Sequence, residues 1–123
     1  MRVTCGTDII EVSRVKDAIE KFEERFISRI YTELETTYCN SKETRYQHFA
    51  ARFAAKEAVF KAISQSFDNK YDLKWTDIEI MLDKNQRPIV NLKMNIEGLK
   101  QIDVSLSHIE QYATATCVAV FED

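Results

Sequence analysis

Hydrophobic residues in the first part of the chain recur at helical spacing. Val15, Ile19 and Phe22 follow one another at steps of three and four, among charged residues. This pattern predicts one amphipathic helix over about residues 13–30, with its apolar face turned toward a core. The segment before it, up to Glu11, alternates only weakly and predicts a short strand that passes into a turn.

Two further helices are expected before the pattern changes. Thr32 and Glu35 have the spacing of a capping box, so a short helix is predicted from there to about Asn40. From Ser41 to about Ser64, aromatic and aliphatic residues again recur at helical steps, which predicts a third and longer helix.

Downstream, the period of the hydrophobic pattern becomes two. Residues 78–82 and 90–94 alternate between apolar and polar on either side of a polar turn, which predicts a β-hairpin. Residues 102–107 and 112–121 predict two more strands. The expected fold is therefore α+β, with an antiparallel or mixed sheet packed with one long helix and one or two shorter ones. Since no linker divides the chain, a single domain over 1–123 is expected.

Composition narrows the range of functions. Lys and Arg number 17 and Asp and Glu number 20, giving a formal net charge of −3, which excludes a broadly basic surface for nucleic acid. No apolar run approaches the ~18 residues needed to cross a bilayer, and the chain does not open on a signal sequence. The three cysteines lack the spacing of a metal or redox site, so buried reduced thiols and a cytoplasmic location are expected.

Acidic groups in two distant segments have the placement of a cation site. Asp8 and Glu11 lie in the turn expected after the first strand, and Glu57 lies in the long helix. Such carboxylates suit Mg²⁺, which prefers oxygen ligands and is usually held by one or two carboxylates plus substrate phosphates. Glu57 and Lys61 share a helix face. They can form an intrahelical ion pair or place a carboxylate and an ammonium beside one phosphate.

His108 ends a predicted strand and follows Ser105 and Ser107 closely. It can bind a phosphate, transfer a proton or close a local hydrogen-bond network. A serine and histidine nucleophile is the weaker interpretation, because the sequence identifies no acid that would orient the imidazole.

A basic stripe, defined as Arg14, Lys21 and Arg25, lies on the first predicted helix. Separations of seven and four residues return to nearly the same side of a helix that turns by about 100° per residue. Interspersed acidic residues dilute the stripe, which is either ordinary solvated surface or a docking site for an acidic helix of a partner protein.

Two segments together resemble the motifs of phosphopantetheinyl transferases. Residues 6–11, Gly-Thr-Asp-Ile-Ile-Glu, resemble G-x-D-x-x-E, and residues 53–61 resemble F-x-x-K-E-x-x-x-K. The chain length and the segment Val-Ser-Leu-Ser-His at 104–108 resemble the short bacterial branch, the holo-acyl-carrier-protein synthases. The resemblance extends from Gly6 to about Val120 and implies the 4′-phosphopantetheinyl transferase fold.

The resemblance also implies an activity. Members of this family transfer 4′-phosphopantetheine from coenzyme A to a serine of apo acyl carrier protein and release adenosine 3′,5′-bisphosphate. Asp8 and Glu57 would ligate Mg²⁺, and Lys61 would stabilise the leaving phosphate. Glu57, directly or through a metal-bound water, could take the proton from the serine, whereas Glu11 would have a supporting role. The alternative is a non-catalytic carrier-binding module with the same fold.

Further contacts follow from the same resemblance. Lys56 and His108 would contact phosphates of coenzyme A, and Pro88 would border its adenine. The basic stripe would dock the acidic helix of the carrier protein. Family members of this length assemble as trimers with active sites between subunits, so a homotrimer is expected here.

The chain departs from the family pattern in two loops. Many relatives have a K-A-L-G-x-G stretch after the long helix, where residues 61–66 here read Lys-Ala-Ile-Ser-Gln-Ser. The hairpin turn at 85–88 reads Asn-Gln-Arg-Pro and also lacks glycine. Backbone contacts to coenzyme A in these loops are therefore expected to differ.

Overall fold

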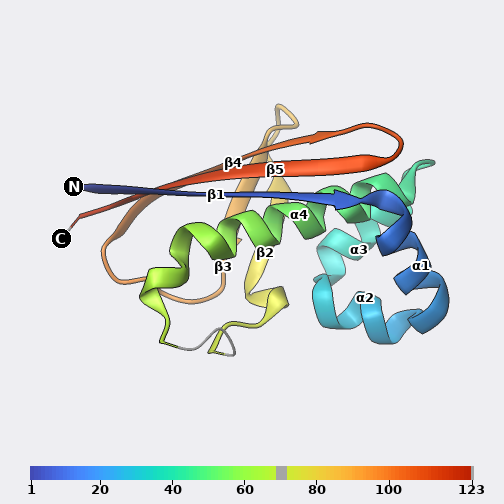
Figure 1. Cartoon of the computed structure of the whole chain (residues 1–123), viewed down its shortest axis with the longest axis horizontal. Coiled ribbons are helices and arrows are strands. Elements are labelled where there is room, and N and C mark those ends of the chain that lie inside the picture. The colour runs from blue at the N-terminus through green and yellow to red at the C-terminus, as the bar shows by residue number, and fades with distance from the viewer. Residues whose placement is uncertain (69–71, 123) are drawn as a thin grey trace.

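The structure, a computed structural model, describes residues 1–68 and 72–122. Helices fill the first half of the chain and strands most of the second (Figure 1). In chain order the elements are β1 (Arg2–Glu11), α1 (Val12–Phe22), α2 (Glu24–Ile30), α3 (Glu33–Asn40), α4 (Arg45–Ile63), the 3-10 turns η1 (Ser64–Ser66) and η3 (Trp75–Asp77), β2 (Ile78–Leu82), β3 (Pro88–Leu92), β4 (Leu99–His108) and β5 (Tyr112–Phe121).

The described strands form two antiparallel sheets. β1, β5 and β4 make a three-stranded sheet in that order, whereas β2 and β3 form a separate hairpin. α4 runs along one face of the three-stranded sheet, and α1, α2 and α3 gather at one end of it (Figure 1). The predicted α+β fold is confirmed, and the pairing is antiparallel throughout the described residues.

Small side chains allow α4 to lie close to the sheet. Gly6 of β1 faces the helix, and a Cβ added there would lie 2.1 Å from the carbonyl oxygen of Ala58 and 2.8 Å from Cβ of Lys61. Alternate residues of β5 face the same helix and are at most 1% exposed; they are Ala113, Ala115, Cys117, Ala119 and Phe121. The core is therefore built on close approach of helix and sheet.

Three of the predicted boundaries were wrong. The first strand continues to Glu11, because β5 supplies a partner along its whole length, so Asp8 lies within the strand and not in a turn after it. The helix expected over 13–30 breaks at Glu23, whose φ of 51° ends α1 and begins α2. Ser41 closes α3 as its C-cap, and α4 begins at Arg45.

The thiols only partly follow the expectation of burial. All three are free, and burial raises the pKa of both Cys39 and Cys117 to about 12. Cys5 is exposed on the outer face of the sheet, so the prediction of burial was wrong for it. Within residues 1–68 and 72–122, no helix is both long and apolar enough to cross a membrane.

Candidate active site

One cavity brings together the two carboxylates that the sequence singled out. Asp8 comes from the side of β1 that faces α4, and Glu57 comes from α4 itself. Both line a cavity of about 350 Å³, together with Arg14, Phe26 and Phe53. We call this space the carboxylate cavity.

Lys61 lies beside Asp8. Its ammonium donates to the carbonyl oxygen of Thr7 at 2.8 Å and lies 3.4 Å from Oδ1 of Asp8. The Lys61 side chain is half exposed, so solvent and a bound ligand can both reach its charge. Lys61 therefore contacts β1, in addition to sharing a face of α4 with Glu57.

The donor set at the carboxylate cavity fits Mg²⁺. Asp8 and Glu57 supply two carboxylates from two elements. Within the described residues, no cluster of three His, Cys, Asp or Glu side chains could form a closed metal centre. Mg²⁺ commonly keeps several waters and binds one or two carboxylates plus substrate phosphates. Two protein ligands that leave room for water and phosphate oxygens satisfy that preference.

Glu11 lies elsewhere, although it belongs to the same motif as Asp8. It is the last residue of β1 and lines a different cavity, beside Ser13 and Tyr112. Its side chain makes no capping hydrogen bond to α1. Glu11 therefore does not join Asp8 and Glu57 at the carboxylate cavity, and its supporting role stays a prediction.

Lys56 does not line the carboxylate cavity, although it lines another cavity, of about 680 Å³, that Glu57 also borders. Its side chain is fully buried, and its ammonium lies 2.7 Å from Oε1 of Glu35. It also donates to the carbonyl oxygens of Trp75, at 3.1 Å, and Ile78. Burial lowers the pKa of Lys56 while Glu35 opposes that shift. Because three protein acceptors surround the three N–H donors, the expected contact between Lys56 and a coenzyme A phosphate does not fit.

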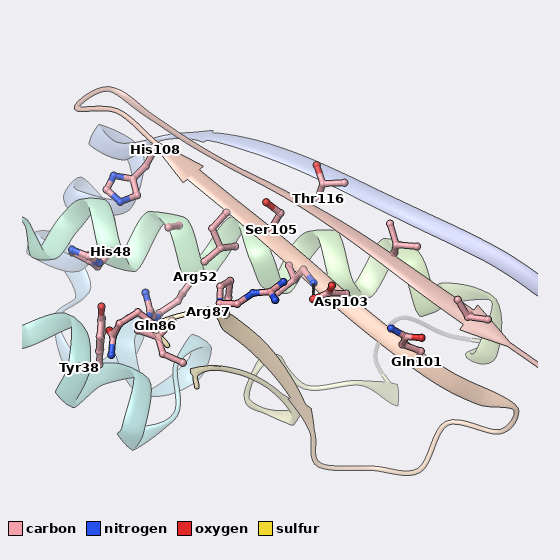
Figure 2. Close-up of a pocket in the computed structure, with 17 residues that line it drawn as sticks. Tyr38, His48, Arg52, Gln86, Arg87, Gln101, Asp103, Ser105, His108 and Thr116 are labelled. Carbon is pink, nitrogen blue, oxygen red and sulfur yellow. Dashed lines mark hydrogen bonds between the residues drawn. The ribbon is translucent and has the colours of Figure 1, made fainter. Parts of the chain in front are cut away.

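A second cavity, which we call the cationic cavity, contains both Pro88 and His108. Its volume is about 660 Å³, and it lies where α3, α4, the β2–β3 turn and β4 meet (Figure 2). Arg52 and Arg87 line it, while Asp103 is the one carboxylate among the described residues that line it. The balance of charge favours an anionic ligand.

Arg52 is a residue of this cavity that sequence reasoning missed. It is only 3% exposed, and among the described residues its Nε has no hydrogen-bond partner. Its guanidinium carbon lies 4.3 Å from the centre of the Tyr38 ring. A buried guanidinium N–H without an acceptor lowers the stability of the fold unless a bound ligand accepts its hydrogen bond. The sequence signal that could have identified Arg52 is its position as a charged residue among the apolar residues of the long helix.

The turn beside this cavity holds Gln86 in a left-handed conformation, with φ of 65°. Such a φ costs a non-glycine residue roughly 1 kcal/mol, and this is the hairpin in which glycine was missing. We expect Gln86→Gly to raise the free energy of unfolding by up to about 1 kcal/mol, measured by urea denaturation. The neighbouring Asn85→Gly, at a residue without positive φ, should give no increase. Equal effects of both changes would contradict this explanation.

The break between α1 and α2 rearranges the basic stripe. Arg14 lines the carboxylate cavity. Lys21 and Arg25 instead flank the exposed ring of Phe22, with cation to ring-centre distances of 5.2 and 5.6 Å. The stripe is therefore one cation beside the carboxylates and two cations around an exposed aromatic ring.

The α+β fold, the two carboxylates of one cavity and the cations of the other are typical of a protein that binds an anionic ligand together with a metal cation. A family model described as the 4′-phosphopantetheinyl transferase superfamily matches residues 4–117. The chain belongs to this superfamily, and the recognition made from the two motifs is confirmed.

Named relatives and solved structures agree with this assignment. A holo-[acyl-carrier-protein] synthase of Chloroherpeton thalassium is 42% identical over 115 residues, covering 92% of this chain and 93% of that protein. One from Chlamydia trachomatis is 40% identical over 116 residues, covering 93% and 96%. The Helicobacter pylori synthase in complex with coenzyme A superposes with a TM-score of 0.82 at 27% identity, covering 94% and 99% of the two chains.

Proposed function

We propose that this chain is a holo-[acyl-carrier-protein] synthase, which transfers 4′-phosphopantetheine from coenzyme A to a serine of apo acyl carrier protein. The observation that carries the proposal is that Asp8 of β1 and Glu57 of α4 line one cavity, with the Lys61 ammonium 3.4 Å from Oδ1 of Asp8. A non-catalytic carrier-binding module would not need this polar group, so catalysis is the better supported alternative.

We infer that the cationic cavity receives part of coenzyme A. Arg52, Arg87 and His108 offer donors to phosphate oxygens, and Pro88 and Tyr38 offer apolar surface to a purine. The Helicobacter pylori relative was solved with coenzyme A, which supports this choice of donor. Adenosine 3′,5′-bisphosphate would leave as the second product.

Asp8 and Glu57 would hold Mg²⁺ in the carboxylate cavity. When bound there, Mg²⁺ would neutralise negative charge on the coenzyme A pyrophosphate. The neighbouring ammonium of Lys61 adds a positive charge on the same side. This arrangement suits phosphoryl transfer, in which catalysis depends mainly on positioning and on stabilising charge.

We propose the following roles for the chain's own side chains. The hydroxyl oxygen of the carrier serine attacks the phosphorus that bears the pantetheine, and the bridging P–O bond to the nucleotide breaks. Glu57, directly or through a water, accepts the proton that the serine loses. Lys61 stabilises the charge that develops on the leaving phosphate. Arg14 at the rim of the carboxylate cavity would face the incoming carrier.

The basic stripe and Phe22 are proposed as the docking surface for the acidic helix of the carrier. We expect Lys21→Glu to weaken carrier binding by about threefold to tenfold at low salt, because a like charge then faces the acidic helix. The effect should shrink at high salt. Titration calorimetry with apo carrier measures it, and Lys100→Glu, an exposed residue of β4, is the control with the same charge change. Equal affinity of both variants would leave the stripe as ordinary surface.

A homotrimer is proposed as the working assembly. The carboxylate cavity and the cationic cavity share no lining residue, so one donor molecule could join them across two subunits. The outer face of the three-stranded sheet exposes apolar side chains, with Val3, Ile9 and Val118 at 60%, 67% and 42%. An uncovered apolar face of this kind marks an interaction surface. Free thiols fit the proposed cytoplasmic location, and the proposed reaction on an acyl carrier protein fits a role in fatty acid biosynthesis.

Mass spectrometry of the carrier tests the reaction directly. With coenzyme A and Mg²⁺, the apo carrier should gain the mass of one phosphopantetheine, because the serine oxygen replaces the nucleotide on phosphorus. A chelator should abolish the gain and added Mg²⁺ should restore it. Absence of an adduct with several bacterial carriers would overturn the proposed function, and transfer that survives the chelator would overturn the metal assignment.

A further inference from the structure

Both histidines of the chain lie at one end of the cationic cavity. The sequence contains two histidines in all, and His48 from α4 meets His108 from the end of β4 (Figure 2). Their ring centres are 5.5 Å apart in an edge arrangement. Nδ1 of His108 is 3.0 Å from Oε1 of Gln47. His48 matches none of the motifs that the sequence contains.

We propose that His48 is a further binding residue for the donor, that it and His108 together bind one of the donor's phosphate groups, and that His48 takes up a proton as it does so. This proposal rests on the proposed function, since it places coenzyme A in the cationic cavity. It adds a residue to the site and makes donor binding depend on pH.

Three groups that can carry positive charge surround His48. Arg52 lies one turn further along α4, Lys42 lies between α3 and α4, and His108 lies on β4. Tyr38 of α3 contributes a neutral ring 5.7 Å from that of His48. Burial, followed by Arg52, His108 and Lys42, lowers the pKa of His48. The imidazole is therefore largely neutral at pH 7 while the cavity holds no anion.

The charged groups further along the cavity do not reverse this balance. Arg87 reaches in from the turn before β3, and Asp103 lies beyond it, away from the two rings (Figure 2). The Asp103 carboxylate accepts the backbone N–H of Val104 at 3.0 Å. Its negative charge is thus partly satisfied at the far end of the cavity.

A bound phosphate would reverse the electrostatics at His48. Its negative charge favours the protonated imidazole, so the pKa of His48 should rise on binding. At any pH between the free and bound values, the complex holds more protons than the free protein, and affinity increases as pH falls. Arg52, whose buried Nε has no hydrogen-bond partner in the described part of the chain, supplies a second donor beside the rings. Hydrogen bonds from charged donors to phosphate oxygens are stronger than those between neutral groups.

Nuclear magnetic resonance of the two imidazoles tests the proposal, because two histidines give two assignable signals. We expect saturating coenzyme A to raise the titration midpoint of His48 by about one pH unit or more. Between pH 6.5 and 8.5, calorimetry in buffers of different ionisation enthalpy should show proton uptake. Dephospho-coenzyme A distinguishes the ribose phosphate from the pyrophosphate: loss of the shift assigns the contact to the former, and its retention to the latter.

Variants separate proton uptake from simple packing of the two rings. His48→Phe keeps an aromatic edge against His108 and Tyr38, and His48→Gln keeps polarity without titrating in this range. Both should weaken coenzyme A binding by roughly tenfold at pH 6.5 and by less at pH 8.5. Losses that do not change with pH, or midpoints that stay fixed under saturating coenzyme A, would overturn the proposal.

The proposed function and this inference fail in different ways. A protein that binds no coenzyme A and modifies no carrier at any pH overturns both of them. A protein that modifies the carrier but takes up no proton on binding coenzyme A overturns only the role of His48.

Discussion

Gly6→Ala is expected to destabilise the protein by about 3 kcal/mol or more. The new Cβ would lie 2.1 Å from the carbonyl oxygen of Ala58, and a backbone atom of the central helix cannot rotate away as a side-chain end can. α4 would have to move away from β1, which opens the core that the alanines of β5 fill. Gly6 therefore allows α4 to pack closely against β1.

Chemical denaturation of Gly6→Ala measures this loss as a lower midpoint. Cys5→Ala in the same strand is the matched control, because Cys5 is exposed and its replacement should change the free energy of unfolding by less than about 0.5 kcal/mol. A Gly6→Ala protein as stable as the control would show that the helix and strand do not pack as tightly as described.

Asp8→Asn and Glu57→Gln are expected to reduce phosphopantetheine transfer by on the order of a hundredfold to a thousandfold or more. Each change keeps the shape of the side chain and removes one negative charge from the carboxylate cavity. Asp8→Asn also removes the charge that faces the Lys61 ammonium. Neither change removes a core side chain, so the fold should persist.

Initial rates of carrier modification at several Mg²⁺ concentrations measure the loss, and circular dichroism confirms the fold. Glu11→Gln is the control within the same motif, since its side chain lines another cavity. We expect this variant to retain most of its rate. Full activity in both Asp8→Asn and Glu57→Gln would contradict the assignment of the cavity.

Local patterns predicted the elements better than their ends. Hydrophobic periodicity identified the helices and the hairpin, because it reports which face is buried. It did not reveal the break at Glu23, since Phe22 and Phe26 on either side continue the apolar pattern. Nor did it show that β1 runs to Glu11. That length depends on pairing with β5, more than a hundred residues away.

The site divides in a similar way. Motif resemblance identified Asp8 and Glu57, which line one cavity, and Lys61, whose ammonium lies beside Asp8. It gave neighbouring Lys56 a ligand role that its complete burial contradicts. Arg52 and His48 were missed because their surroundings come from α3, β4 and the hairpin turn, and spacing along one helix does not report such neighbours.

The buried ion pair of Lys56 and Glu35 fixes the orientation of α4 about its axis through residues that lie outside the proposed active site. The Glu35 carboxylate accepts the backbone N–H groups of Thr32 at 2.8 Å and Ile80 at 2.7 Å besides contacting Lys56. Replacing one of the two residues would leave the other charge buried without a partner, which lowers the free energy of unfolding by about 3–5 kcal/mol. Replacing both by apolar residues of similar size can leave the stability unchanged. Since Glu57 follows Lys56 directly, the orientation of the proposed catalytic carboxylate depends on contacts that α3 and β2 make with Lys56. Positions 35 and 56 can therefore change only together, in evolution or in redesign. Even a double replacement that preserves stability could displace the Glu57 carboxylate and lower the activity.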